Sequence, residues 1–220
     1  MSFHDMKDSG RVRKILGIRV TWLSDGSIRL DQEVYARSIL EEFGMQDCKS
    51  KELPMSPSIN LNDETSPKLM IESHRKFRHI IGRSTYLAGG TRVDIQFTVN
   101  RLSQHLAEPR QVHQAAANHL LRYIRRTIGY AITYMSGTKG SNGRLMGYLD
   151  TSFGNGTKHQ SISGYMFMIA GGPISWSSRK QPITALSITE AEYIAAAEAA
   201  KQAVWLRHFL YAIQKHQVYD

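Results

Sequence analysis

Three carboxylates in the last third of the chain are the residues whose types and spacing could do chemistry. Asp150 follows the apolar run at residues 145–149, and Glu190 and Glu192 begin a long alanine-rich run. Carboxylate oxygens are the hard ligands that Mg²⁺ requires, so two such groups brought together could support metal-dependent chemistry. Whether they meet depends on the elements that carry them.

Short apolar runs precede the alanine-rich segment, and each is bounded by glycine, asparagine or a basic turn. Their aromatic and β-branched residues predict strands at 145–149, 163–169 and 173–178. Residues 191–213 contain many alanines and neither proline nor glycine, which predicts a long helix. The sequence therefore predicts three strands followed by a helix, with Asp150 on the first strand and the two glutamates at the start of the helix.

Four motifs occur in order across this region. They are Gly147-Tyr148-x-Asp150, Ser161-x-Ser163-Gly164-Tyr165-x-Phe167, Ile174-Ser175-Trp176-x-Ser178-x-x-Gln181, and Ser187-x-x-Glu190-Ala191-Glu192-Tyr193 with Trp205-Leu206-Arg207 after it. Together they resemble the RNase H region of copia-type LTR retrotransposon Pol polyproteins. The resemblance implies an α/β (α+β) fold, with an RNase H-like mixed sheet and a flanking helix, truncated after this first long helix.

The preceding part of the chain is predicted to be mostly helical after an initial hairpin. Residues 15–30 read as a β-hairpin around Asp25-Gly26, and residues 33–43 as a helix with Asp31 as N-cap and Gly44 as C-cap. These segments are similar to the copia reverse transcriptase where the palm passes into the thumb. No Tyr-x-Asp-Asp hairpin is present, so we expect no polymerase active site.

The resemblance also divides the chain into four parts. We expect the end of the reverse transcriptase palm and the thumb helix at 1–48, a proline-containing linker at 49–69, a helical connection region at 70–140 and a partial RNase H-like domain at 141–220. The motif Thr91-Arg92-Val93-Asp94-Ile95 matches the family in the third part, with Val93 in place of the usual proline.

For the carboxylates, the resemblance implies hydrolysis of the RNA strand of RNA/DNA hybrids by two Mg²⁺ or Mn²⁺ ions. Asp150 matches the first catalytic metal ligand. Glu190 and Glu192 point roughly 200° apart on a helix, so one site cannot easily use both. The family register selects Glu192 as catalytic ligand, and Glu190 then serves as a charge favoured at the helix N-terminus.

Further acidic positions of the family pattern are not found in this sequence, and Asp220 is the remaining candidate for a third metal ligand. We therefore expect hydrolysis to be impaired. The alternative prediction is a nuclease-dead, domesticated protein that acts as a nucleic-acid or protein-binding module.

The charge of the chain favours a nucleic-acid partner. The formal net charge is +9, and the first 140 residues hold 21 Lys and Arg against 14 Asp and Glu. Arg122, Arg125 and Arg126 fall on one helix face. We predict that they contact the backbone of a duplex or RNA/DNA hybrid, with further contacts from Lys158, Arg179 and Lys180. The alternative is a solvated basic face.

Compartment and assembly follow from what the sequence lacks. A single cysteine, Cys48, excludes an internal disulfide, and there is no secretory signal and no apolar run of the ~18 residues that a membrane span needs. We expect an intracellular protein, nuclear or cytoplasmic, without membrane contact. A sheet cut short leaves an unpaired edge, which predicts a homo-oligomer or a partner that completes it.

Overall fold

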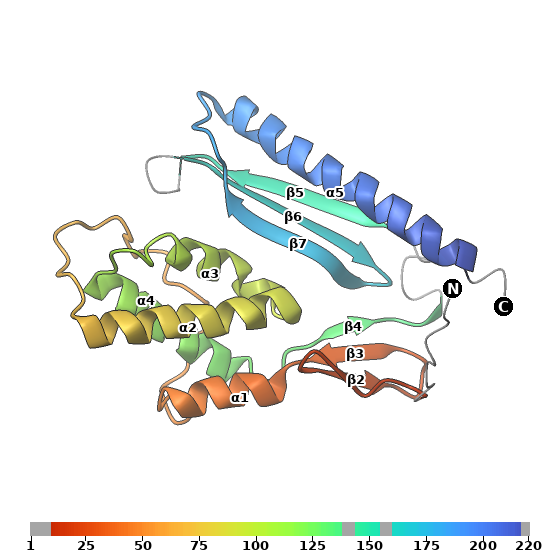
Figure 1. Ribbon diagram of the computed structural model, residues 1–220, viewed down its shortest axis with the longest axis horizontal. Helices are drawn as coiled ribbons and strands as arrows, with labels where there is room; N and C mark the ends of the chain where they lie inside the picture. The colour runs from red at the N-terminus through yellow and green to blue at the C-terminus, as the bar shows by residue number, and fades with distance from the viewer. Residues whose placement is uncertain (1–9, 138–143, 155–159, 217–220) are drawn as a thin grey trace, which may run out of the picture.

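The computed structural model describes residues 10–137, 144–154 and 160–216 (Figure 1). Within these ranges the protein is mixed α/β, with five α-helices, one short 3₁₀ helix and two small antiparallel sheets. Two predicted site residues, Lys158 and Asp220, lie outside the described residues. Within the described ranges no helix is long and apolar enough to cross a membrane.

The first sheet confirms the predicted hairpin and extends it. Its strands, in spatial order, are β1 (Lys14–Ile15), β2 (Ile18–Trp22), β3 (Ile28–Asp31) and β4 (Ile132–Tyr134). The turn between β2 and β3 needs glycine at position 26, where φ is +84°. Asp25 tightens the same turn by accepting the Ser27 N–H at 2.9 Å. Strand β4 comes from about 100 residues further along the chain, so no local pattern predicts its place in this sheet.

A helical body packs beside this sheet. It consists of α1 (Glu33–Glu42), α2 (Ile71–Gly90), η1 (Val93–Ile95), α3 (Gln96–Ser103) and α4 (Gln111–Arg126). One hydrophobic core joins α1, α2, α3 and α4, and it also includes Leu61, which is 3% exposed. The proline-containing segment at 49–69 is therefore packed against the helical body through Leu61.

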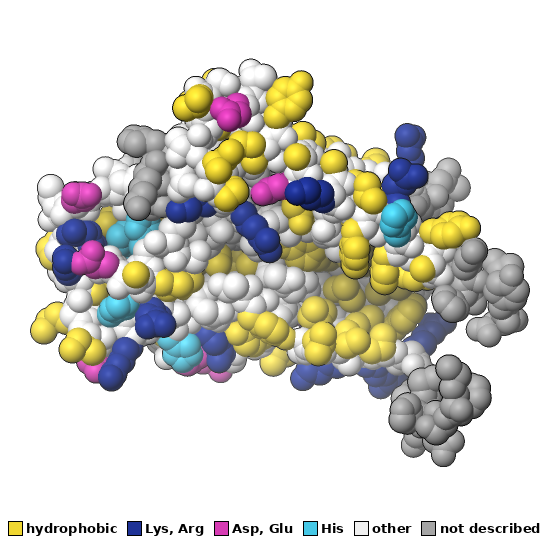
Figure 2. Space-filling view, turned by 45° about the horizontal axis from the view of Figure 1, so that its top comes forward, with side chains coloured by type: hydrophobic (Ala, Val, Ile, Leu, Met, Phe, Trp, Pro, Cys, Tyr) yellow, Lys and Arg dark blue, Asp and Glu magenta, His cyan; other side chains and the backbone are white. Residues whose placement is uncertain are grey.

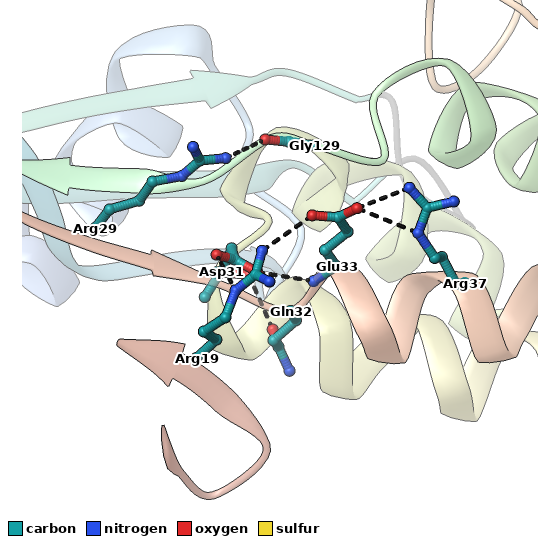
Figure 3. A network of polar contacts seen from close by, with 8 residues as sticks. Arg19, Arg29, Asp31, Gln32, Glu33, Arg37 and Gly129 are labelled. Carbon is teal, nitrogen blue, oxygen red and sulfur yellow. Dashed lines mark hydrogen bonds and ion pairs between the residues drawn. The ribbon is translucent and has the colours of Figure 1, made fainter. Parts of the chain in front are cut away.

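The start of α1 differs from the prediction that Asp31 is its N-cap. Gln32 occupies that position and makes no side-chain cap hydrogen bond. Asp31 belongs to β3, where its carboxylate pairs with Arg19 at 3.0 Å and accepts the Glu33 N–H at 3.2 Å. Figure 3 shows how Glu33 lies between Arg19 and Arg37. Hydrogen bonds from Arg37, and then from Arg19, lower the pKa of Glu33.

The second sheet and the last helix confirm the predicted three strands and long helix. The elements are β5 (Met146–Ser152), β6 (Ile162–Ile169), β7 (Gly172–Lys180) and α5 (Ile188–His216), with sheet order β5-β6-β7. Phe167 of β6 packs against Ala199 and Leu206 of α5. The helix begins three residues earlier than predicted because Ser187 accepts the Glu190 N–H at 3.1 Å, which caps its first turn.

Strand β7 connects the second sheet to the rest of the molecule. The Trp176 indole N–H donates to the Ala88 carbonyl at the end of α2, at 3.0 Å. The Tyr134 hydroxyl of β4 donates to the Pro173 carbonyl at 2.7 Å. Figure 1 shows the resulting layers, with the second sheet between α5 on one side and α2 and α3 on the other.

The exposed side of α5 carries several large apolar side chains. Several of its large side chains are between 49% and 74% exposed: Tyr193, Val204, Trp205, Phe209 and Tyr211. Figure 2, turned so that the α5 side comes forward, shows hydrophobic side chains gathered on this side of the molecule. The Trp205 and Phe209 rings stack with 5.3 Å between their centroids, as expected for residues four apart on a helix.

Two stacked histidines lie between the ends of α3 and α4. The ring centroids of His105 and His113 are 3.9 Å apart. His113 accepts the Arg110 N–H at Nδ1, and its Nε2 lies 2.8 Å from the Leu61 carbonyl oxygen. A neutral ring with the proton on Nε2 satisfies both contacts. Burial lowers the pKa of both rings, and that of His105 falls to about 4 with a smaller contribution from His113.

We expect the protein to lose stability as pH falls from about 6.5 to about 4. An unfolded histidine titrates near pH 6.5. Below that pH the unfolded chain binds protons that the two folded histidines do not yet bind, because their pKa values are lowered. The free energy of unfolding therefore decreases. Urea unfolding at about pH 7, 5.5 and 4.5 measures this loss. His105→Gln should flatten the pH dependence, and an unchanged slope in this variant would exclude His105 as its source.

Candidate active site

The structure brings Asp150 and Glu192 to the same pocket. Asp150 lies near the end of β5, and Glu192 lies in the second turn of α5. The pocket has a volume of about 330 Å³ and opens to solvent. Its lining consists of Leu149, Asp150, Thr151, Glu192, Tyr193 and Ala196. The antiparallel pairing of β5 with β6 and the packing of α5 on this sheet place the two carboxylates together although they are 42 residues apart in sequence.

Both carboxylates are available to a ligand. The side chains of Asp150 and Glu192 are exposed, and within the described part of the chain neither has a hydrogen-bond or ion-pair partner. Glu190 differs, because its carboxylate accepts the Leu186 N–H at 2.6 Å, just before α5. The structure thus places one glutamate in the cap of the helix and the other in the pocket with Asp150.

The donor set of the pocket suits a hard divalent cation. Carboxylates are the oxygen ligands that Mg²⁺ and Mn²⁺ accept, and both ions commonly keep several waters as further ligands. Thr151 is already engaged, since its hydroxyl donates to the Ile162 carbonyl at 3.2 Å. Among the residues that the structure describes, no group of three or more His, Cys, Asp or Glu side chains could hold a metal.

Sequence reasoning missed one residue behind the pocket. Gln181 follows β7 directly and is only 1% exposed. Its side-chain nitrogen lies 2.8 Å from both the Ser163 hydroxyl and the Ala191 carbonyl. The only signal was its place in the third motif, because a polar residue after a strand is ordinarily read as part of a loop.

The three arginines of α4 have protein contacts as well as exposed surface. Arg122 donates to the Lys49 carbonyl and Arg125 to the Gln46 carbonyl. Arg126 pairs with Glu52 at 3.4 Å. This face therefore holds residues 46–52 against α4, which gives the arginines a structural role beside the predicted contact with nucleic acid.

The other described basic residues predicted to bind nucleic acid lie at the end of β7. Arg179 is exposed and Lys180 is partly buried. They belong to the second sheet, whereas the three arginines belong to the helical body. Any nucleic acid that contacted both groups would span the two parts of the molecule.

The fold and the pocket define a mixed α/β protein in which two carboxylates, neither in an ion pair with a described residue, line one open pocket. The sequence matches no protein-family model, and no solved structure matches the chain. Relatives among known proteins give the family. The retrovirus-related Pol polyprotein from transposon TNT 1-94 of Nicotiana tabacum is 35% identical in an alignment over 219 residues, which covers 97% of this chain and 16% of the polyprotein.

Two shorter proteins are also similar to this chain. The putative transposon Ty5-1 protein of Saccharomyces cerevisiae is 34% identical over 202 residues, covering 90% of this chain and 64% of that protein. An uncharacterised mitochondrial protein of Arabidopsis thaliana is 32% identical over 205 residues, 93% of this chain and 82% of that protein. The homologues of this chain are copia-type retrotransposon Pol polyproteins, together with shorter proteins that match the same region. The chain spans less than two thirds of the tobacco and yeast proteins.

Proposed function

We propose that this chain corresponds to the end of a retrotransposon reverse transcriptase together with an RNase H-related domain. In this proposal it binds RNA/DNA hybrid or a related nucleic acid and supports metal-dependent hydrolysis of the RNA strand at an impaired rate. The observation that carries the proposal is the meeting of Asp150 and Glu192 in one open pocket, both exposed and neither with a partner among the described residues. Similarity to the retrotransposon Pol polyproteins supports the same assignment.

Asp150 and Glu192 would hold Mg²⁺ or Mn²⁺ in this pocket. When bound, such ions activate the attacking water and stabilise the leaving oxygen in phosphodiester hydrolysis. The chain itself presents the two carboxylates from a strand and a helix. The packing of these two elements fixes the positions of the carboxylates. Leu149 and Ala196 contribute apolar lining beside the two carboxylates.

Basic side chains would supply affinity for the phosphate backbone. The chain has a formal net charge of +9, and Arg179 is exposed at the end of β7. The guanidinium groups of the three α4 arginines carry further N–H donors beyond those that hold residues 46–52. Binding of this kind weakens steeply as salt rises and reads no base sequence.

A second candidate is a module that binds nucleic acid without cutting it. It is supported by the acidic cluster of the described residues, which contains two carboxylates and no third metal-ligating side chain. Positioning of the ions by the side chains that bind them directly provides most of the catalysis in such sites, so a pair of ligands alone favours slow hydrolysis.

The test is incubation of the protein with a labelled RNA/DNA hybrid in Mg²⁺, in Mn²⁺ and in EDTA. We expect cleavage of the RNA strand in either metal, none of the DNA strand, and none in EDTA. Binding is measured in parallel at about 50 and 200 mM salt, between which a contact of this type loses a large part of its affinity. Salt-sensitive binding without cleavage would favour the second candidate, and absence of both would overturn both.

A further inference from the structure

We propose that Gln181 is a positioning residue for the carboxylate pocket. Its side-chain amide ties the start of α5 to the start of β6, which is paired with the end of β5, and this fixes Glu192 relative to Asp150. The inference rests on the proposed function, because it assigns Gln181 a role toward the metal that the two carboxylates would hold.

The contacts of Gln181 reach the chain directly beside both carboxylates. Its Nε2 lies 2.8 Å from the Ala191 carbonyl, one residue before Glu192. The same nitrogen lies 3.5 Å from the Thr151 hydroxyl, one residue after Asp150. Gln181 is itself held from the backbone, since its N–H donates to the Ser161 carbonyl at 2.8 Å.

The orientation of the amide follows from its partners. The Ala191 carbonyl can only accept, so the amide nitrogen must face it. The second N–H of Nε2 donates to the Ser163 hydroxyl at 2.8 Å. The Thr151 hydroxyl gives its proton to the Ile162 carbonyl and keeps lone pairs toward Gln181. The two N–H groups of one amide therefore link β6 and α5, and Ser163 of β6 is paired in the sheet with Thr151 of β5, the residue after Asp150.

The oxygen of the same amide is buried at a cost in stability. The Oε1 atom of Gln181 is buried and has no hydrogen-bond partner among the residues that the structure describes. A buried unsatisfied acceptor destabilises the fold, so an apolar side chain of similar shape would avoid the penalty. A glutamine at this place is best explained by its two donors, which an apolar residue cannot provide.

Loss of these donors should displace the first turns of α5. Metal ligands need to be held within roughly 0.5 Å of their working positions. Removal of the outer residues that orient metal ligands commonly costs 10- to 100-fold in metal affinity. Gln181 acts on the peptide units next to the ligands, so we expect an effect of this size.

Gln181→Met tests the proposal, because methionine has a similar shape and no donors. The matched control is Gln202→Met: Gln202 also joins α5 to the sheet, through Nε2 to the Ser175 hydroxyl at 3.0 Å, but lies ten residues, about 15 Å, further along the helix than Glu192. Free Mn²⁺, followed by its paramagnetic resonance signal, gives the affinity. Hydrogen exchange of the metal-free proteins reports how firmly residues 191–195 are held.

We expect Gln181→Met to weaken Mn²⁺ binding by about 10- to 100-fold and to speed exchange at residues 191–195. Gln202→Met should change neither. Asp150→Asn, measured beside them, tests the proposed function separately, because it should remove Mn²⁺ binding.

The outcomes separate the two proposals. Wild-type affinity in Gln181→Met together with loss of binding in Asp150→Asn would overturn the positioning role and leave the proposed function standing. If the wild type binds no Mn²⁺, the proposed function fails and exchange alone decides. Faster exchange in Gln181→Met would then support the tie between α5 and the sheet, and unchanged exchange would overturn it.

Discussion

Hybrid cleavage by the Asp150→Asn and Glu192→Gln proteins is expected to be at least about 100-fold slower than by the wild type. Metal-assisted charge stabilisation contributes several kcal/mol to such reactions, and each 1.4 kcal/mol corresponds to a factor of ten in rate. Each substitution replaces an anionic ligand by a neutral amide of the same shape. Single-turnover cleavage at saturating protein measures the chemical step without a contribution from binding.

Folding should be unaffected in both variants, because neither carboxylate has a partner among the described residues. Thermal unfolding midpoints within about a degree of the wild type would establish this, since surface changes of this kind are worth less than about 0.5 kcal/mol. If one of the two variants cleaves at the wild-type rate, the residue that it replaces is not a ligand in the active site.

Glu190→Gln is the matched control. Glu190 accepts the Leu186 N–H just before α5, so its loss of charge should cost up to about 1 kcal/mol of stability. Cleavage should remain at the wild-type rate. If Glu190→Gln were slow and Glu192→Gln normal, the choice between the two glutamates would be reversed.

The C-terminal elements could be predicted because their patterns are local. A short run of aromatic and β-branched residues predicts each strand of the second sheet, and the many alanines predict α5. The angle of roughly 200° between residues two apart on a helix forces a choice between Glu190 and Glu192. The structure then places Glu192, the residue chosen, in the pocket with Asp150.

The features that could not be predicted depend on contacts between distant parts of the chain. Strand β4 pairs with β3 across about 100 residues. The arginines of α4 read as a free basic face until the fold brings the carbonyls of residues 46–52 onto them. Gln181 reads as a loop residue until Ala191 and Ser163 surround it. Hydrogen-bond partners of this kind are set by tertiary packing, which no window of sequence contains.

The motif at residues 91–95 shows the same limit, because its function in the fold is structural. Arg92 is 2% exposed in its side chain and pairs with Asp94, 26% exposed, at 2.8 Å. The guanidinium also donates to the Thr127 carbonyl at 3.1 Å, just beyond α4. The Tyr123 hydroxyl donates to Asp94 at 2.9 Å. The motif thus ties the junction of α2 and η1 to the end of α4.

Asp94→Asn is expected to lower the free energy of unfolding by about 3–5 kcal/mol, because it leaves the buried Arg92 charge without its counterion. Asparagine keeps the shape of the side chain and an oxygen for Tyr123, so the loss reports the charge. Urea unfolding at pH 7 measures it. Glu33→Gln, which removes the more exposed ion pairs with Arg19 and Arg37, is the control and should cost about 1 kcal/mol or less.

A second readout distinguishes loss of the ion pair from general loosening of the core. Burial, with the Asp94 carboxylate as the next cause, raises the pKa of Tyr123 to about 12. Asp94→Asn should lower this pKa toward its ordinary value near 10, as measured by ultraviolet titration of tyrosinate. The double variant Arg92→Met/Asp94→Asn should recover part of the lost stability, because no buried charge then remains unpaired. A double variant less stable than Asp94→Asn alone would mean that Arg92 stabilises this junction mainly through Thr127 and the neighbouring rings, and not through its charge pair with Asp94.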